Sequence, residues 1–329
     1  MYSNPFHDQS LENYNFLITG GAGFIGSHLA EYLLKFGAKK VKILDNLSTG
    51  FIDNINPFFI NNNFEFLEGD IRNLETCQKA CKDVDFIFHQ AALGSVPRSI
   101  EDPITTNGVN IDGFLNMLVA ARDNIVKKFI YAASSSTYGD SKNLPKIENE
   151  IGKPLSPYAI TKYVNELYAE IFYNQYGLKS IGLRYFNVFG PRQSPQGAYA
   201  AVIPLFIEAI LKNISPKING DGETTRDFTF ISNVVQANIK SIFADEKADG
   251  EIFNVAVGES TSLNKMFNLL TQFSNSELKA FHAPEREGDI RNSLADISKA
   301  KNLLNYHPEI KIEEGLRLTL EWFKHNIEH

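Results

Sequence analysis

The glycine-rich segment Gly21-Ala22-Gly23-Phe24-Ile25-Gly26 directly follows a short apolar segment and begins a helical pattern. The apolar segment covers residues 15–19, and apolar side chains recur at helical spacing over residues 24–36. A strand, a tight glycine turn and a helix N-terminus in this order let a pyrophosphate approach the backbone closely. The sequence therefore predicts a Rossmann-type dinucleotide-binding unit. The residues expected to hold the cofactor here are Gly20, Gly23, Phe24, Ile25 and Gly26.

A carboxylate follows the second expected strand at the position that distinguishes the two nicotinamide dinucleotides. Asp45 lies 19 residues after Gly26 and would accept hydrogen bonds from the adenosine ribose hydroxyls. It would repel a ribose 2′-phosphate, and residues 46–51 contain no Arg that would offset the repulsion. The sequence therefore favours NAD over NADP. Further cofactor contacts are expected at Asn46, Asp70, Ile71, Gln90, Ala91 and Ala92, with a structural turn as the alternative role of Asp70.

Short apolar segments alternate with helical patterns along the first half of the chain. Strands are expected at residues 15–19, 41–44, 64–67, 85–89, 128–132 and 180–184, and helices at residues 24–36, 74–82, 111–121 and 158–176. Such alternation predicts an α/β fold, with a Rossmann-type, doubly wound parallel sheet that is covered by helices on both faces.

A turn-rich stretch after residue 189 marks the expected start of a smaller, mixed α/β domain that binds the substrate. Residues 1–14 are expected to form a polar N-terminal extension, residues 15–189 the NAD-binding domain, and residues 190–329 the substrate domain. Within the last of these, residues 228–257 are expected to pack back on the first domain.

The composition argues against several classes of partner. A net charge of −7 and a pI near 5.6 provide no electrostatic basis for nucleic-acid binding. No stretch approaches about 18 consecutive apolar residues, and residues 1–14 contain no apolar run, so neither a membrane span nor a signal peptide is expected. Cys77 and Cys81 are interpreted as reduced thiols rather than metal ligands, because no other Cys or His accompanies them. We therefore expect a cytoplasmic protein without a metal site.

A tyrosine and a lysine four residues apart open the helical pattern at residues 158–176. Tyr158 and Lys162 share one face of that helix, so the lysine ammonium would lower the pKa of the phenol and help it to act as a base. Ser134 follows the fifth strand and could relay a proton or hold a substrate oxygen. Such pairs also occur by chance on surfaces, and serines often form turns. Their position after a dinucleotide-binding unit nevertheless predicts a catalytic site at Ser134, Tyr158 and Lys162.

These motifs together resemble the extended short-chain dehydrogenase/reductase family over residues 16–321. Residues 94–99, 132–139, 184–190 and 197–204 are similar to bacterial UDP-N-acetylglucosamine 4-epimerases. The resemblance implies a two-domain enzyme with tightly held NAD, and often a homodimer built from two helices per subunit. It implies that Tyr158 is the base, that Lys162 lowers its pKa and binds the cofactor ribose, and that Ser134 is the catalytic hydroxyl.

The resemblance also implies which residues bind a UDP-sugar. Asn187 would contact the diphosphate, and Arg226 and Arg286 would clamp it, although each Arg taken alone could form a surface ion pair instead. The other expected substrate contacts are Gly94, Ser95, Ser135, Ser136, Ala201, Val202, Asp289 and Ser293.

Two places in the sequence narrow the expected reaction. The family's 4,6-dehydratases carry an Asp-Glu pair after the catalytic hydroxyl, and its decarboxylases carry a nearby Glu, whereas this chain has Ser135 and Ser136. Serines supply no carboxylate, which favours epimerisation. Ser293 stands where epimerases that reject N-acetylated sugars carry a bulky aromatic residue, so UDP-N-acetylglucosamine and UDP-N-acetylgalactosamine are the expected substrates.

Other readings of the sequence remain open. UDP-glucose and UDP-galactose are further possible substrates of the same epimerase. The first rival is another nucleotide-sugar enzyme, such as a uronic-acid epimerase or a reductase with an exchangeable cofactor. The second rival is a non-catalytic NAD-binding scaffold, which would not need Tyr158, Lys162 and Ser134 together.

Overall fold

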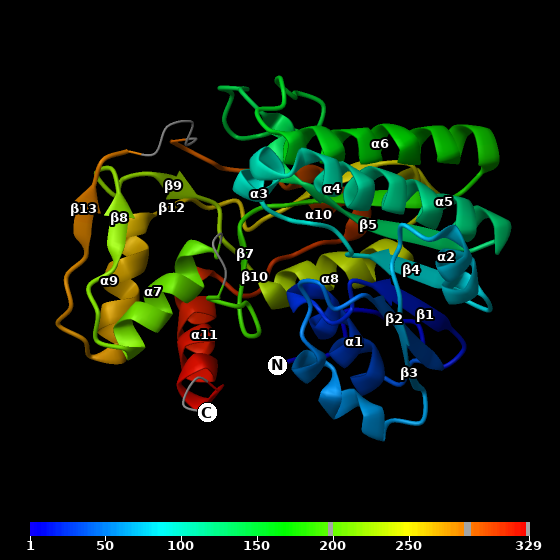
Figure 1. Cartoon of the computed structure of the whole chain (residues 1–329), viewed down its shortest axis with the longest axis horizontal. Helices are drawn as coiled ribbons and strands as arrows, with labels where there is room; N and C mark the ends of the chain where they lie inside the picture. Colours follow the sequence, from blue (N-terminus) through cyan, green and yellow to red (C-terminus); the bar gives the residue numbers. More distant parts are fainter. Residues whose placement is uncertain (197–199, 286–290, 327–329) are drawn as a thin grey trace.

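The computed structural model describes residues 1–196, 200–285 and 291–326. Its larger lobe is built on a seven-stranded parallel sheet in the order β11-β6-β5-β4-β1-β2-β3 (Figure 1). The strands are β1 (Asn15–Thr19), β2 (Lys40–Asp45), β3 (Phe64–Glu68), β4 (Phe86–His89), β5 (Lys128–Ser134), β6 (Ser180–Tyr185) and β11 (Ile252–Val255). The order reverses between β1 and β4, which places a ligand crevice beyond the carboxyl ends of these strands. The doubly wound fold expected from the sequence is confirmed.

Helices cover both faces of the sheet. One face carries α1 (Phe24–Lys35) and α8 (Ile231–Ile242), which pack on each other. The other face carries α2 (Leu74–Cys81), α5 (Gly113–Asp123) and α6 (Pro157–Tyr176). The segment before α5 is already helical, through α3 (Val96–Glu101), α4 (Pro103–Asn107) and a π-helical turn, η3 (Gly108–Asp112). Short 3₁₀ turns form at η1 (Ile52–Asn54), η2 (Asn56–Ile60), η4 (Ser135–Tyr138) and η5 (Glu246–Ala248).

The start of α6 is defined by local sequence. The Ser156 side chain accepts a hydrogen bond from the Ala159 N–H, and Pro157 occupies the first helical position. Both features fix a helix N-terminus, because they satisfy or remove N–H groups that lack intrahelical partners. Gly177 ends the helix with a φ of +68°, in the left-handed region that glycine adopts without strain. These caps hold Tyr158 in the first turn of a helix that is anchored at both ends.

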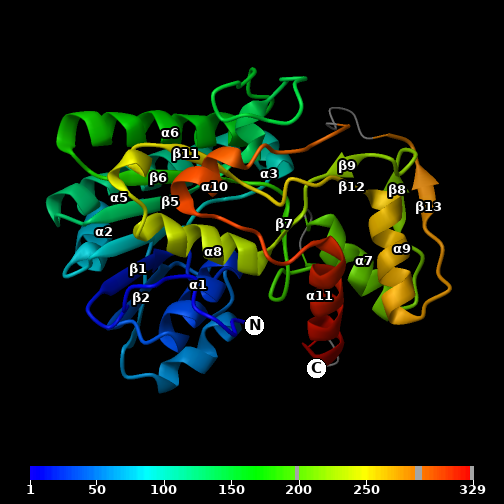
Figure 2. The ribbon, with the colours of Figure 1, turned by 180° about the vertical axis from the view of Figure 1, so that it is seen from behind.

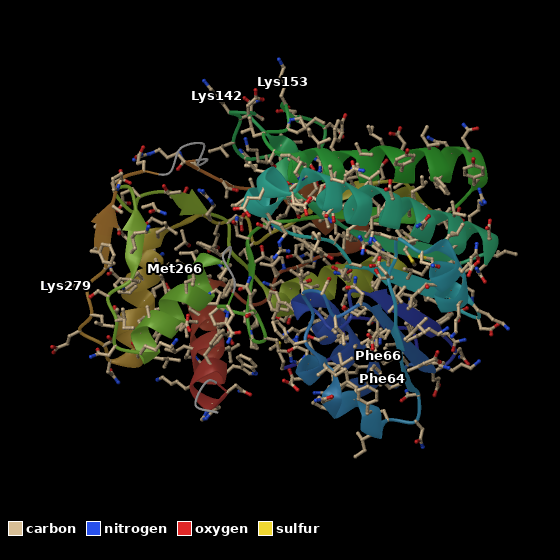
Figure 3. The ribbon with its side chains drawn as sticks, viewed as in Figure 1. Phe64, Phe66, Lys142, Lys153, Met266 and Lys279 are labelled. Carbon is tan, nitrogen blue, oxygen red and sulfur yellow. The ribbon has the colours of Figure 1, made fainter. Side chains whose placement is uncertain are left out.

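The smaller lobe is formed by α7 (Val202–Leu211), α9 (Leu263–Ser274) and α11 (Ile312–Asn326), with short strands along one side (Figure 1). Met266 is fully buried on α9, which packs on α7, whereas Lys279 points outward at the far edge of this lobe (Figure 3). The short strands pair as β7 (Val188–Phe189) with β10 (Thr229–Phe230), β8 (Lys217–Asn219) with β13 (Phe281–Ala283), and β9 (Thr225–Arg226) with β12 (Thr261–Ser262).

Two elements from the second half of the chain belong to the larger lobe. α8 packs on α1, and β11 pairs with β6 at the edge of the sheet, where α10 (Ser298–Leu304) lies beside it (Figure 2). The two lobes are therefore interleaved in sequence, and the chain crosses between them several times.

Residues 1–14 precede β1, but they are not a purely polar extension. Tyr2 and Leu11 are almost completely buried, and the ring of Phe6 stacks on Tyr32 of α1 with centroids 5.3 Å apart. Tyr2 packs edge-on against the same Tyr32 at 5.2 Å. A few isolated apolar residues carry no periodic signal, so the sequence did not reveal that this segment packs on α1.

The thiols and the helices show two further properties. Burial raises the pKa of Cys77 and of Cys81 to about 12, so both thiols stay protonated at neutral pH.

Across residues 1–196, 200–285 and 291–326, no helix combines the length and apolarity that crossing a bilayer requires.

Candidate active site

A cleft of about 540 Å³ runs along the carboxyl ends of the sheet strands, where the topology places a ligand crevice. The structure brings every residue expected to contact the cofactor into the wall of this first cleft. These residues are Gly20, Gly23, Phe24, Ile25, Gly26, Asp45, Asn46, Asp70, Ile71, Gln90, Ala91, Ala92 and Lys162. Gly94 and Ser95, which were expected to contact the sugar, line the same cleft.

The glycine turn has the form that a dinucleotide requires. Gly20 has a φ of +67°, and a Cβ there would lie 2.7 Å from the Ala91 backbone nitrogen. A Cβ at Gly26 would overlap the carbonyl oxygen of Gly20, so any side chain would push the helix away from the turn. The N-terminus of α1 has no side-chain cap, and its first residues face the cleft. Its free N–H groups and helix dipole suit a pyrophosphate.

Two carboxylates lie at the β2 and β3 end of the cleft. Asp45 accepts hydrogen bonds from the N–H groups of Ala22 (2.9 Å) and Leu47 (2.8 Å), which still leaves lone pairs for ribose hydroxyls. Asp70 is held by the Arg72 guanidinium at 2.7 Å, and this pairing lowers the pKa of Asp70 to about 2. The guanidinium of Arg72 is thus bound to Asp70 and is not directed at a ribose phosphate. This agrees with the preference for NAD, which has no 2′-phosphate.

Several residues in the wall of the cleft were not predicted from the sequence. Tyr185 lies at the end of β6, and its hydroxyl is within 3.2 Å of Gln90 Oε1. Gln193 lies in the loop after β7 and lines the same cleft as the glycine turn. Tyr185 lies at the carboxyl end of an expected strand, which is a position that indicates the ligand crevice. Nothing in the sequence around Gln193 indicates a nucleotide site.

Ser134 and Tyr158 form a hydrogen-bonded pair deep in the cleft. The Ser134 Oγ accepts hydrogen bonds from the N–H and the hydroxyl of Ser136, at 3.1 and 2.9 Å. Its own proton is therefore available for the Tyr158 oxygen, with which it is hydrogen-bonded. Burial raises the pKa of Tyr158 above its usual value, and the hydrogen bond from Ser134 lowers it.

Lys162 contacts a backbone carbonyl rather than the phenol oxygen, and its predicted effect on the pKa of Tyr158 stays a prediction. Its Nζ donates to the Ala132 carbonyl oxygen at 2.7 Å and lies 6.0 Å from the centre of the Tyr158 ring. The pKa of Tyr158 is raised rather than lowered, because burial outweighs the help it receives. Burial also lowers the pKa of Lys162 to about 8, although the negative charge of Glu166 acts to raise it. The i,i+4 spacing placed the two groups on one helix face but did not reveal that both are desolvated.

A buried ion pair supports the helix that carries Lys162. Glu166 lies one turn further along α6 and accepts two hydrogen bonds from Arg184 of β6, at 2.8 and 2.7 Å. Their side chains are 2% and 3% exposed. The remaining Nη1 of Arg184 donates to the carbonyl oxygen of Glu148 at 2.8 Å. This paired and hydrogen-bonded network fixes α6 against the sheet beside the catalytic residues.

A second cleft, of about 480 Å³, is lined mostly by the smaller lobe, and Asn187 in its wall lies in sequence between Tyr185 and Val188 of the first cleft. Asn187, Val202 and Arg226 line it, and Ala201 lies at the N-terminus of α7 between two lining residues. Apolar side chains such as Phe206 and Phe228 form much of the remaining wall. The structure thus brings two of the expected diphosphate contacts, Asn187 and Arg226, into the wall of one cleft.

The other predicted substrate residues have different positions. Ser135 and Ser136 begin the 3₁₀ turn after β5, and the Ser136 hydroxyl contacts the site by its hydrogen bond to Ser134 Oγ. Ser293 donates its N–H to the Thr225 carbonyl oxygen at 3.1 Å, which places it beside Arg226. Arg286 and Asp289 lie outside the described residues.

The family model described as GDP-mannose 4,6 dehydratase matches residues 17–319. Two curated proteins are similar over nearly the whole chain. The putative UDP-glucose 4-epimerase of Methanocaldococcus jannaschii is 39% identical over 312 residues, covering 94% of this chain and 98% of that protein. The UDP-glucuronate 4-epimerase of Thermodesulfobacterium geofontis is 36% identical, covering 95% and 97%.

Two solved structures share this fold and more than a third of the sequence. One is a UDP-N-acetylglucosamine 4-epimerase from Methanobrevibacter ruminantium in complex with UDP-N-acetylmuramic acid, with 42% identity and a TM-score of 0.89 over 95% of this chain and 98% of that one. The other is a UDP-glucose 4-epimerase from Thermus thermophilus in complex with NAD, with 34% identity and a TM-score of 0.86 over 95% and 99%.

Proposed function

Because this chain belongs to the extended short-chain dehydrogenase/reductase family, among its UDP-sugar 4-epimerases that use NAD, we propose that it interconverts UDP-N-acetylglucosamine and UDP-N-acetylgalactosamine. UDP-glucose and UDP-galactose are its second proposed substrate pair. The observation that carries this proposal is the pairing of Ser134 with Tyr158, beside Lys162, at an end of the cleft that has no carboxylate among its described lining residues.

The distribution of carboxylates favours epimerisation over elimination or decarboxylation. The acidic residues among the described residues that line the first cleft are Asp45 and Asp70, and both lie at the β2 and β3 end. Next to Ser134 stand the hydroxyls of Ser135 and Ser136, which supply no carboxylate acid or base. Inverting one carbon requires a proton acceptor and donor at one oxygen, and Tyr158 meets that need alone.

The chain's own residues move one proton at one oxygen. NAD, when bound, supplies the two-electron oxidant and reductant for carbon 4 of the sugar. Tyr158 accepts the proton of the 4-hydroxyl as the 4-keto sugar forms and returns it after the sugar has turned. Ser134 donates a hydrogen bond to the phenol oxygen and stabilises its ionised form. Lys162, held by Ala132, places a cation in the same desolvated pocket.

The second cleft is proposed to hold the nucleotide while the sugar turns. Asn187 and Arg226 line it, and an Arg fork suits a diphosphate in charge and geometry. Its apolar wall would bury the flat face of the base. A substrate anchored only through its nucleotide leaves the 4-keto sugar free to present its other face.

The small side chain of Ser293 is the basis for proposing that an N-acetyl group is accepted. It is half-buried beside Arg226 on the segment that leads from the smaller lobe to the larger one. A small side chain there leaves room for a substituent at carbon 2. Ser293→Tyr is expected to abolish turnover of UDP-N-acetylglucosamine while leaving UDP-glucose turnover within a few-fold of the wild type. Equal turnover of the acetylated sugar by both proteins contradicts this assignment.

A neutral sugar fits the catalytic end better than a uronic acid does. Lys162 is the cation among the described residues that line the first cleft, and its Nζ is directed to a backbone carbonyl. A hexuronate would find no Arg among these described lining residues to bind its carboxylate with two parallel hydrogen bonds. Side-by-side product analysis with UDP-N-acetylglucosamine, UDP-glucose and UDP-glucuronate, with no added NAD, tests this ranking.

We also propose that the enzyme is a homodimer that pairs through α6 and its neighbours. α3, α4 and α5 all pack on α6 (Figure 1), and apolar side chains remain exposed on this layer. They are Ile100, Ile104, Ile160, Leu167 and Ile171, which are 44% to 83% exposed. An apolar helical stripe of this kind is suited to a second copy of itself. Sedimentation of the wild type and of Ile104→Asp with Leu167→Asp tests this, with a monomeric wild type contradicting it.

A further inference from the structure

The loop at residues 190–193 carries the chain away from the larger lobe, and it borders the cofactor cleft. Gln193 lines that cleft, as do Phe24 and Ile25 at the start of α1. In Figure 1 the N-terminus lies beside α1, near the green segment that follows β7. The loop is therefore in a position to bound the dinucleotide on the side that faces the smaller lobe.

Two contacts fasten this loop to α1, the helix that follows the glycine turn. The Pro191 carbonyl oxygen lies 2.9 Å from Nε2 of His28. The Arg192 guanidinium pairs with Glu31 at 2.5 Å and lies 5.9 Å from the centre of the Phe58 ring. Arg192 adopts a φ of +65°, which a non-glycine residue holds only when its surroundings fix it.

The protonation of His28 follows from its surroundings. The ring is 1% exposed, and burial lowers the pKa of His28 to about 3, so it is neutral and carries one proton. A backbone carbonyl only accepts, so that proton is on Nε2 and is donated to Pro191. Nδ1 is then an acceptor, and the Tyr2 hydroxyl lies 3.3 Å from it. The N-terminal segment thus orients the histidine that holds the loop.

Gln193 presents an acceptor at the cleft. Its Nε2 donates to the Val188 carbonyl oxygen at 3.0 Å, which fixes the orientation of the amide because a carbonyl cannot donate. Within the part of the chain that the structure describes, Gln193 Oε1 is buried and has no hydrogen-bond partner. Ribose hydroxyls and a carboxamide are donors that a nicotinamide dinucleotide carries and that would satisfy this oxygen.

We propose that residues 190–193 are a latch that retains the dinucleotide between turnovers, and that Tyr2, His28 and Glu31 hold this latch closed against α1. The inference rests on the proposed function only in taking NAD as the cofactor. An epimerase regenerates its NAD in every cycle, so retention serves it in a way that it would not serve an enzyme that exchanges its cofactor. Tyr2, His28 and Glu31 are positioning residues in this account, whereas Gln193 contacts the ligand.

The experiment measures how fast bound NAD leaves the full-length protein. NAD per chain is quantified by chromatography after denaturation, in protein preloaded with NAD and then exposed to an NAD glycohydrolase that destroys released cofactor. Tyr2→Phe removes one hydroxyl, and Glu31→Gln removes the charge that holds Arg192. Each variant is expected to lose NAD about fivefold faster than the wild type, the effect of losing one ordinary hydrogen bond.

Two matched variants serve as controls. Tyr14→Phe removes a hydroxyl from the same segment, on a ring that packs against Phe86, and Glu321→Gln breaks the exposed pair with Arg317 on α11. Both are expected to lose NAD at the wild-type rate. Wild-type retention in both Tyr2→Phe and Glu31→Gln overturns the latch. The latch is also overturned if the control variants lose NAD as fast as Tyr2→Phe and Glu31→Gln do. It is overturned as well if the faster loss of NAD disappears when the variants are compared at equal folded fractions.

Epimerase assays on the same samples separate this inference from the proposed function. If the wild type converts no UDP-sugar but the two variants still lose NAD faster, the proposed function fails and the latch stands. If the wild type epimerises and both variants keep their NAD, the latch fails and the proposed function stands.

Discussion

Ser134 donates a hydrogen bond to the phenol oxygen of Tyr158. This hydrogen bond lowers the pKa of the phenol, whereas burial raises it. Lys162 belongs to the same helix as Tyr158, yet its ammonium is bound to the Ala132 carbonyl oxygen. Ionisation of the phenol therefore depends directly on Ser134, and the lysine contributes its charge from a fixed, desolvated position.

Removing the Ser134 hydroxyl should raise the pKa of Tyr158 further and slow the reaction. For Ser134→Ala we expect kcat to fall by about 10² to 10³, within the range for loss of positioned proton-transfer help. The rise of activity with pH should also shift to higher pH, because a higher pKa requires more alkaline solution to ionise the phenol. Ser134→Thr keeps a hydroxyl and should retain more activity than Ser134→Ala. A pH–rate profile that is unchanged in Ser134→Ala contradicts the role.

The buried ammonium of Lys162 makes a pH-dependent contribution to stability. Its folded pKa of about 8 lies below the usual value of 10.5, so the folded state binds this proton less firmly than the unfolded state does. Charged Lys162 therefore costs stability below pH 8, and the cost fades as the pH rises towards 10.5. Relative to Lys162→Met, the wild type should gain about 3 kcal/mol of unfolding free energy over that interval. Urea unfolding of both proteins at pH 7.5 and pH 10 measures the difference, and a constant difference contradicts the shifted pKa.

Gly26→Ala should disrupt the cofactor site from within the protein. The added methyl overlaps the carbonyl oxygen of Gly20, so the glycine turn and α1 must separate. We expect the variant to purify with little NAD and to lose about 2 kcal/mol of stability. Gly108→Ala is the control, since its Cβ meets only ordinary contacts at 3.9 Å and its φ is −56°. Wild-type NAD content in Gly26→Ala argues against a dinucleotide at this turn.

Glu166→Gln should destabilise the enzyme more than a surface change does. The substitution leaves the buried guanidinium of Arg184 without its charged partner, which typically costs about 3 to 5 kcal/mol. Glu321→Gln, in the exposed pair with Arg317, should cost less than about 1 kcal/mol. Chemical denaturation of the two variants provides the comparison. Equal, small losses contradict the structural role of the buried pair.

The order of strands and helices followed from the sequence because each apolar run is buried by the same parallel sheet. The strand at Asn15–Thr19 has the bounds that its apolar residues indicated, and α6 differs by a single residue at its N-terminus. Local signals also located the glycine turn and Asp45, since a dinucleotide site demands them at a fixed distance from a strand.

The features that the sequence did not reveal depend on contacts between distant parts of the chain. The pKa of Tyr158 is raised by burial among segments that are remote in sequence, which the spacing to Lys162 alone does not reveal. The packing of Tyr2 on α1 and the place of Gln193 in the cleft depend in the same way on how the lobes fold together. Such positions carry no periodicity and no motif that a single sequence displays.

The most direct test of the central claim uses the protein as purified, with UDP-N-acetylglucosamine and no added NAD. Nuclear magnetic resonance of the sugar nucleotides should show UDP-N-acetylgalactosamine accumulating to an equilibrium mixture with the wild type. Tyr158→Phe should bind NAD as the wild type does and form essentially no product. Wild-type protein that carries NAD but forms no epimer from UDP-N-acetylglucosamine, or a Tyr158→Phe variant with undiminished turnover, would contradict the account.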